Sequence, residues 1–454
     1  MKLILYTDDT THDVTLFTRS LMLTRSIRAP YEQLRAELQI PAEHRDVLPL
    51  SSTGVINLDL WGVLMEGERA LFVGRLQNTS SGLEVVTDER EGGIIRSRPI
   101  QLSFGSWLTP LIEGEIYLTG QGQVEGHILD LAAFGRRFRA LSHNLLSTRN
   151  VGQVLDNWWK ELAPSYRLPK TLLNGISLLQ FGNVATNRDA FITDRKHVQR
   201  NVFGLALNAM GKIGGGSTAW GLIRSIFDVE PNLIELFCTL EHDESQPLEI
   251  NPRIIYRIKP FIVGEIPTEA GASVDGSVQS MASIQEVATD LDSDQIISVD
   301  FSQNSEDRVN AVYLNTPLTP SRGVELFGLA GDPQIDRDDI ERAGLRLYRG
   351  SWPFFPQGKS TDGKSQGFTS EIQYLIDLAA VIVGEDHRYV SGTIKIRGDF
   401  RLIAGGWLAV PVGVYGENET LFVYAETITH QIYIDDQGVI IHRTNIEFTR
   451  GHYA

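Results

Sequence analysis

The chain has 454 residues and a mass of 50.6 kDa, enough for roughly two to four domains that each bury a core. Its formal net charge is -16, which argues against a general nucleic-acid binder and against a partner for anionic membrane surfaces. The one cysteine, Cys238, lies in the apolar stretch LIELFCTL, so an intrachain disulfide and a cysteine-based metal site are excluded and a buried thiol is predicted.

The sequence offers no targeting or membrane segment. The start, MKLILYTDDTTHDV, lacks the apolar run of a signal peptide. No window reaches the roughly 18 uninterrupted apolar residues of a membrane helix. We therefore expect a protein that is made and folded in a cytoplasm.

Residues 14–145 have mostly β character. The stretch INLDLWGVLMEGERALFVGRLQN places Gly67 in a turn between two apolar runs, Leu60 to Met65 and Ala70 to Leu76, as a hairpin requires. Further short runs, GGIIRSRPIQLSF and GEIYLTGQGQVEGHI, are broken by Gly and Pro. Short strands that are separated regularly by such turn residues favour a small barrel or sandwich.

The pattern changes to helical spacing from Ile128 onward. The run VGQVLDNWWKELAP repeats apolar residues at helical intervals, which predicts a helical insertion after the first β unit.

A glycine cluster follows at Gly214 to Gly216. A phosphate-binding loop would need a lysine directly after its last glycine, and Ser217 stands there instead, so the cluster is interpreted as a connector.

Strand-like stretches return in the second half at LIELFCTL, PRIIYRIKPF, QIISVDFSQN and VNAVYLN. Between Ile262 and Asp294 the sequence is polar and acidic, which predicts a long exposed loop with one weak helix. A clear helix is predicted near 370–383, followed by strands to the end of the chain. The order is therefore β, α, β with one helix embedded in the second β part.

The acidic segment GDPQIDRDDIERAGLRLY does not fit a calcium-binding loop. It lacks the alternating ligands, central glycine and closing glutamate of an EF-hand. Asp338 and Asp339 suit the first turn of a short helix, where negative charge meets the helix dipole. A solvated, helix-capping role is predicted for this acidic group.

The last hairpin, YAETITHQIYIDDQGVIIHRTNIEFTRG, collects candidate metal-binding or acid/base groups: His430, His442, Asp435, Asp436 and Glu447. Strand alternation places His430 on one face with Ile428, Ile432 and Ile434. A half-buried imidazole that hydrogen-bonds a neighbouring group is therefore favoured over a metal ligand. Asp435 and Asp436 are assigned to the turn, Gly438 to its positive-φ position, and Glu447 and Arg443 to one face without an ion pair.

Catalytic motifs are not found in the sequence. The nearest glycine-serine pair, at Ser106 in FGSWL, lacks the frame of a nucleophile elbow, and no H-E-x-x-H or dinucleotide fingerprint occurs. We predict no catalytic, cofactor-binding or metal-ligating residues.

A carbohydrate-related function stays open, that of a secreted protein that binds carbohydrate or degrades peptidoglycan or polysaccharide, because 57 acidic residues could supply a carboxylate pair. The seven tryptophans bear on the same function. Trp61, Trp220 and Trp407 are predicted to be core, while the candidates for exposure are Trp107, Trp158, Trp159 and Trp352.

Several stretches in order resemble the baseplate hub proteins of long-tailed bacteriophages, the late control protein D-like family. The end of the chain, FVYAETITHQI and TNIEFTRG, resembles the end of such hubs. NLIELFCTLE with PRIIYRIKPF, then DQIISVDFSQNSEDRVNAVYLN, then GDPQIDRDDIERAGLRLY and SGTIKIRGDFRLIAGGW resemble their second barrel. LMLTRSIRAPYEQLRAELQIP and DLWGVLMEGERALFVGRLQN resemble the first barrel.

The resemblance implies a structural role without catalysis. The alternative that it leaves is a tail-associated protein that binds carbohydrate or degrades peptidoglycan or polysaccharide. The resemblance also implies a homotrimeric ring with two similar barrels per chain, which joins the tail tube protein to the central spike protein and contacts other baseplate or tape-measure proteins. Viral DNA would pass through the lumen without specific binding, and no membrane would be bound. The expected location is the virion tail baseplate.

The combined prediction is a mainly β fold with helical insertions (α+β): two similar small β-barrel domains plus a helical region, assembling as a ring. The predicted domains are a first barrel at 1–127, a helical insertion at 128–230 and a second barrel at 231–454. The second barrel carries the loop at 262–294 and the helix near 370–383.

Overall fold

The computed structural model describes residues 1–28, 31–41, 44, 47–49, 56, 59–80, 83–88, 92–97, 99–109, 112, 171–172, 234–243, 246–258, 261–262, 278–279, 281–303, 308–315, 334–351, 380, 383–384, 389–412, 419–435 and 437–453. These residues are mostly β, which confirms the predicted mainly β class. Nearly all of the predicted helical insertion and of the helix near 370–383 lies outside them. The domain boundaries stay predictions.

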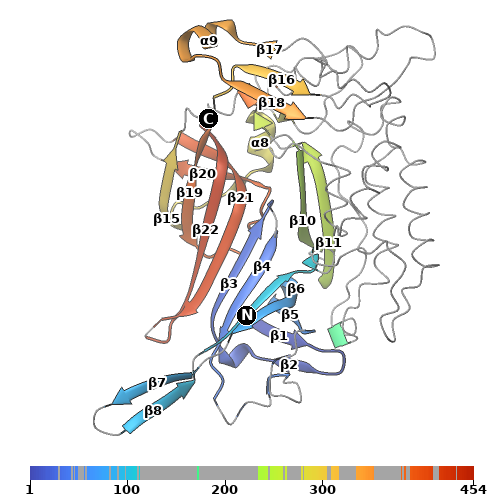
Figure 1. Cartoon of the computed structure of the whole chain (residues 1–454), viewed down its shortest axis with the longest axis vertical. Helices are drawn as coiled ribbons and strands as arrows, with labels where there is room; N and C mark the ends of the chain where they lie inside the picture. The colour runs from blue at the N-terminus through green and yellow to red at the C-terminus, as the bar shows by residue number, and fades with distance from the viewer. Residues whose placement is uncertain are drawn as a thin grey trace, which may run out of the picture.

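One curled, half-barrel sheet of 13 strands dominates the described part (Figure 1). Its strands are β1 (Lys2–Tyr6), β2 (Thr11–Asp13), β3 (Thr18–Ser26), β4 (Glu32–Leu38), β5 (Trp61–Glu66), β6 (Arg69–Ser80), β9 (Ile100–Ser106), β14 (Thr289–Asp290), β15 (Ile296–Ser302), β19 (Val390–Arg397), β20 (Trp407–Val412), β21 (Glu419–Ile434) and β22 (Ile440–Tyr453). The main path runs β15-β19-β22-β21-β3-β4-β9-β6-β5-β1-β2, and every pair along it is antiparallel. The predicted hairpin at Gly67 is confirmed as β5 and β6, with φ of 60° at the glycine.

Strand β21 links the first and last parts of the chain. It is 16 residues long and pairs with β22 along one edge. Along the other edge, residues 419–424 pair with β20 and residues 427–433 pair with β3. Register shifts near Ala425 mark the change of partner, as expected of a β-bulge. The sheet therefore continues without a break from the C-terminal strands into the N-terminal ones.

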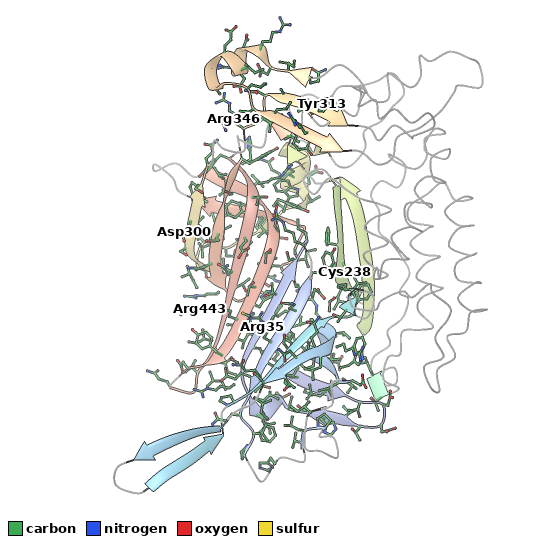
Figure 2. All side chains as sticks on the ribbon, viewed as in Figure 1. Arg35, Cys238, Asp300, Tyr313, Arg346 and Arg443 are labelled. Carbon is green, nitrogen blue, oxygen red and sulfur yellow. The ribbon has the colours of Figure 1, made fainter. Side chains whose placement is uncertain are left out.

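Smaller elements flank this sheet. They are the pairs β7 (Leu83–Asp88) with β8 (Gly92–Ser97), β10 (Ile234–Asp243) with β11 (Gln246–Ile258) and β12 (Phe261–Ile262) with β13 (Val278–Gln279), the sheet of β16 (Ala311–Asn315), β17 (Gln334–Ile335) and β18 (Leu347–Ser351), and the helices η1 (Thr15–Phe17), α8 (Met281–Val287) and α9 (Arg337–Ala343). Strands β10 and β11 contact β6, and Cys238 of β10 is buried as predicted (Figure 2). Among the described helices, none combines the length and the apolarity needed to cross a bilayer.

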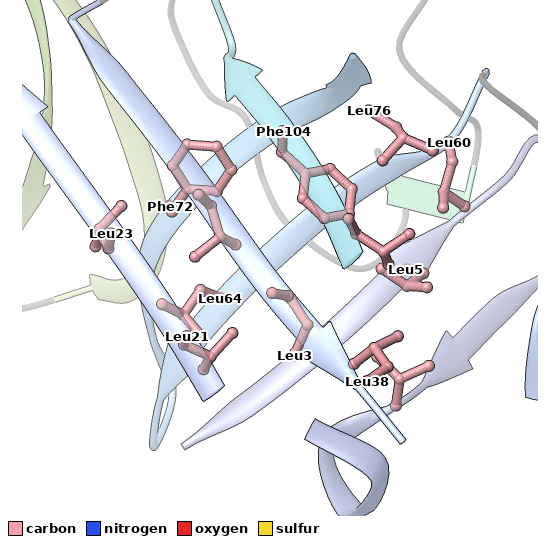
Figure 3. Packing of buried hydrophobic residues seen from close by; sticks show 14 of the residues in the cluster. Leu3, Leu5, Leu21, Leu23, Leu38, Leu60, Leu64, Phe72, Leu76 and Phe104 are labelled. Atoms are coloured by element: carbon pink, nitrogen blue, oxygen red, sulfur yellow. The ribbon is translucent and has the colours of Figure 1, made fainter. Parts of the chain in front are cut away.

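In the described part of the chain, the sheet carries two hydrophobic cores. The first core lies mainly on β1, β3 to β6 and β9, and includes Leu3, Leu64, Phe72 and Phe104 (Figure 3). The second core lies on β19 to β22 with Leu291, and includes Ile394, Val423, Ile428, Ile446 and Phe448. Phe400 and Ile432 belong to the first core although they come from the C-terminal part of the chain. Burial of apolar area is the main stabilising term at both places.

The acidic segment forms α9, in the place where a short helix is predicted. Asp336 is its N-cap, and the Asp336 side chain accepts a hydrogen bond from the Asp339 backbone N–H at 2.9 Å. The predicted solvated role is wrong for Asp339, which is 7% exposed. Its carboxylate accepts hydrogen bonds from Arg308 and Asn310 before β16, so it ties α9 to the small sheet.

Candidate functional site

The turn of the last hairpin follows the sequence prediction. Gly438 has φ of 78°, and its N–H donates to the Asp435 carbonyl at 3.0 Å. The Asp435 side chain accepts from the N–H groups of Gln437 and Val439 at 2.9 and 2.8 Å. This is a three-residue hairpin loop with a glycine bulge, and Asp435 satisfies backbone donors there. Asp436 lies outside the described residues.

His430 is a core residue of the hairpin. Its side chain is 0% exposed, deeper than the half-buried position that alternation predicted. Nδ1 lies 2.9 Å from the Thr444 hydroxyl on the paired strand, and the ring centroid lies 4.8 Å from that of Phe400, with the planes tilted by 40°. Burial, together with the nearby cation of Arg25, lowers the pKa of His430 from 6.5 to about 2. The imidazole is therefore neutral over the physiological range, and its predicted hydrogen-bonded packing role is confirmed.

His442 contacts His430 from the neighbouring strand. Its Nε2 lies 3.4 Å from His430 Nδ1, and its ring centroid lies 4.2 Å from that of Phe400, with the planes tilted by 32°. Burial lowers the pKa of His442, while the Asp399 carboxylate opposes that shift. The side chain of Asp399 is held by Arg401 at 2.7 Å, and this hydrogen bond lowers the pKa of Asp399. The loop after β19 thus covers both histidines.

The geometry gives these histidines no shared ligand set. No group of three His, Cys, Asp or Glu side chains suited to a metal ion occurs in the described part of the chain. Glu447 points to solvent on the return strand, and Arg443 lies over the Tyr433 ring at 6.0 Å. The four candidate residues of the hairpin that the structure describes therefore divide between a packed histidine pair, a turn and an exposed face.

The loop glycine Gly398 permits the close approach of the His442 ring. A Cβ at this position would lie 1.8 Å from the ring, whereas a Cβ at Gly406 of the same loop would lie 3.4 Å from its nearest atom. We expect Gly398→Ala to lower the free energy of unfolding by about 1–3 kcal/mol because the loop must lift from the histidines. Urea unfolding is the measurement and Gly406→Ala the control. Equal losses in the two variants would contradict this account.

A buried charged pair was not identified from the sequence. Arg25 Nε lies 3.6 Å from Glu32 Oε1, with the residues 6% and 2% exposed, and Arg25 donates to the Leu71 carbonyl at 2.6 Å. The missed signal is alternation. Arg25 lies two and four residues after Leu23 and Leu21, and Glu32 lies two residues before Leu34. Alternate residues of a strand lie on one face, so both charges fall on the core face.

A second polar contact joins the two ends of the chain. Glu426 of β21 is 4% exposed, and it accepts hydrogen bonds from Arg28 at 2.9 Å and from the Thr449 hydroxyl. The Glu426 carbonyl also accepts from the Ile27 N–H at 3.0 Å. These bonds secure the place where β21 passes from β20 to β3.

The tryptophan predictions have mixed outcomes. Trp61 and Trp407 are buried as predicted, but the candidate exposure of Trp107 is wrong, because Trp107 is 1% exposed just after β9. Trp158, Trp159, Trp220 and Trp352 lie outside the described residues. The described tryptophans therefore offer no stacking platform for a sugar.

Ser106, the nearest approach to a nucleophile motif, is also buried, and its hydroxyl accepts a hydrogen bond from the Leu108 N–H at 3.2 Å.

Known proteins were compared with the chain by sequence and by structure. No family model and no curated protein matches it. Its structural neighbours include phage tail proteins. The 43 kDa tail protein of prophage MuSo2 from Shewanella oneidensis is 13% identical, with a TM-score of 0.45 over 99% of this chain and 98% of that chain. A tail protein from Neisseria meningitidis is 10% identical, with a TM-score of 0.43 over 98% and 95%. A prophage tail protein from Listeria monocytogenes is 8% identical, with a TM-score of 0.41 over 98% and 94%.

Proposed function

We propose that the chain is the structural hub of a phage tail baseplate. In this proposal three copies form a ring with pseudo-sixfold symmetry, two β units per chain, that joins the tail tube to the central spike and leaves a channel for DNA. The role requires no catalysis, and the protein resides in the virion. The sequence stretches that resemble hub proteins, in their shared order, give the proposal its starting point.

The observation that carries the proposal is the shared strand β21. It pairs with β20 beside the second core and with β3 beside the first, so one sheet spans both cores. A connector that carries load between a tube and a spike needs units that do not swing on a linker. Continuous antiparallel hydrogen bonding, with Glu426 bonded to Arg28 at the crossing, supplies that rigidity.

The charge of the chain suits a DNA channel. A net charge of -16 repels the phosphate backbone, so DNA could pass through a lumen without being retained. The partners proposed are further copies of this chain, the tail tube protein, the central spike protein, and other baseplate or tape-measure proteins.

The test is the mass of the purified protein by size-exclusion chromatography with light scattering. We expect a species of about 150 kDa, three times the 50.6 kDa chain. A chain that stays monomeric when concentrated, and also when mixed with tail tube protein, would argue strongly against the hub. Turnover of peptidoglycan or polysaccharide that disappears when one carboxylate is changed would support the alternative enzyme role.

A further inference from the structure

An apolar pocket of about 460 Å³ lies where the N-terminal strand, η1 and the tip of the last hairpin meet. We call it the N-terminal pocket. Its floor includes core side chains such as Leu3, Leu21 and Phe400. Its wall includes Leu16, which is 94% exposed, and Ile440, which is 70% exposed. Large apolar side chains gathered at the mouth of an apolar pocket mark an interaction surface.

The charges on the wall of this pocket are positive. Lys2 and Arg19 both line it, and both are exposed. The chain as a whole carries a net charge of -16, so two cations beside an apolar pocket depart from its average surface. A complementary surface would combine exposed apolar side chains with carboxylates.

Strand β15 has that combination. It is the terminal strand of the main path, and in the described part of the chain only β19 pairs with it. Ile297 and Phe301 are 54% and 38% exposed. Asp294, just before the strand, and Asp300 within it are exposed carboxylates, and Asp300 lies at the outer margin of the molecule (Figure 2).

The free edge of this strand is only partly protected. Proteins blunt such an edge with lysine, proline, a β-bulge or a covering element, and the sequence IISVDFS contains neither lysine nor proline. A β-bulge lies at its start, between Ile296 and Ser298. Beyond that bulge, no strand in the described part of the chain pairs with the outer edge, so its backbone groups can take part in a contact.

We propose that the acidic, apolar edge at β15 of one copy docks in the basic-walled N-terminal pocket of the next copy. This inference rests on the proposed self-assembly and names its contact. The two surfaces differ, so the contact is heterologous and repeats around a ring until the ring closes. Apolar burial of Ile297 and Phe301 stabilises the contact, and the pairing of Asp294 and Asp300 with Lys2 and Arg19 sets its orientation.

The experiment uses two variants of the full chain. The pocket variant carries Leu16→Ser and Ile440→Ser, and the edge variant carries Ile297→Ser and Phe301→Ser. Leu16, Ile440 and Ile297 are more than half exposed, so the circular dichroism spectra should match that of the parent. Phe301→Ser also removes the edge contact with Tyr453, so a small decrease in the thermal midpoint is expected of the edge variant. A matched control carries Leu345→Ser and Leu347→Ser, which are also exposed, at 64% and 42%, but lie on neither surface.

We expect each variant alone to lose the trimer and to elute as a monomer, while the control remains a trimer. An equimolar mixture of the two variants should form a dimer and stop there. The intact edge of the pocket variant fits the intact pocket of the edge variant, but every further contact is broken. This dimer distinguishes a heterologous contact from a general loss of stability.

Charge reversal gives a second, independent readout. Lys2→Glu with Arg19→Glu should weaken the trimer, more so at low salt, and Asp294→Lys with Asp300→Lys in the same chain should restore it. Trimers that survive in both apolar variants would overturn this inference and leave the hub proposal standing. A parent chain that is itself monomeric would overturn both. The pocket variant could also remain a trimer and lose only its binding to tail tube protein. That result would assign the pocket to tail tube protein and refute the contact between copies.

Discussion

Acidification below pH 6.5 is expected to destabilise the folded chain through His430. The pKa of this imidazole falls from 6.5 in the unfolded chain to about 2 in the core. Above pH 6.5 the ring is neutral in both states and its packing stabilises the fold in full. As the pH falls toward 2, the unfolded chain takes up a proton that the folded chain excludes, at a cost of about 1.4 kcal/mol per pH unit.

Urea unfolding at several pH values between 7 and 4, on the parent and on His430→Asn, measures this effect. At pH 7 the variant should be less stable by about 2 kcal/mol, because the asparagine fills less of the space against Phe400. The difference should shrink as the pH falls and then change sign, because asparagine does not titrate.

His12→Asn is the control for this experiment, since His12 lies near the sheet margin on β2 and hydrogen-bonds Thr10. A difference between parent and His430→Asn that stays constant with pH would refute the assignment.

The position of His430 was predictable because strand alternation is a local property. Ile428, His430 and Ile432 share parity, and the structure buries all three. The turn was predictable for a similar reason, because an aspartate followed three residues later by a glycine with positive φ specifies a bulged hairpin loop. Such features depend on neighbours within a few residues, so the sequence contains them directly.

Contacts between distant segments were not predictable in the same way. The pairing of β3 with β21 joins residues 20–26 to residues 427–433. Each strand has two hydrogen-bonding edges, and the residues near it in the sequence do not determine which strand pairs with which edge. Asp339 was predicted to be solvated because Arg308, its partner, stands 31 residues earlier. Trp107 was a candidate for exposure because the buried turn after β9 carries no periodic signal.

Raising the pH from 4.5 to 7 is expected to destabilise the chain through Glu32, in the opposite sense to His430. Burial raises the pKa of this carboxyl from 4.5 to about 7, although Arg25 at 3.6 Å opposes the shift. Glu32 Oε2 has no hydrogen-bond partner among the described residues, so the charged form is poorly compensated. Below pH 4.5 the carboxyl is protonated in both the folded and the unfolded state, so its titration does not change the free energy of unfolding. Between 4.5 and 7 the unfolded chain ionises first, and stability falls by about 3 kcal/mol in total.

Glu32→Gln isolates this effect because glutamine mimics the protonated carboxyl. The free energy of unfolding of the variant, relative to that of the parent, should rise by about 1.4 kcal/mol per pH unit between pH 4.5 and 7 and stay constant above that range. Glu37→Gln on the same strand, where the carboxylate accepts from Ser20 at 3.2 Å, is the matched control. Between pH 4.5 and 6.5 the slopes from Glu32 and His430 cancel in the parent. Each single variant should therefore reveal the slope of the other residue, and two variants with flat profiles would show that neither buried group titrates as inferred.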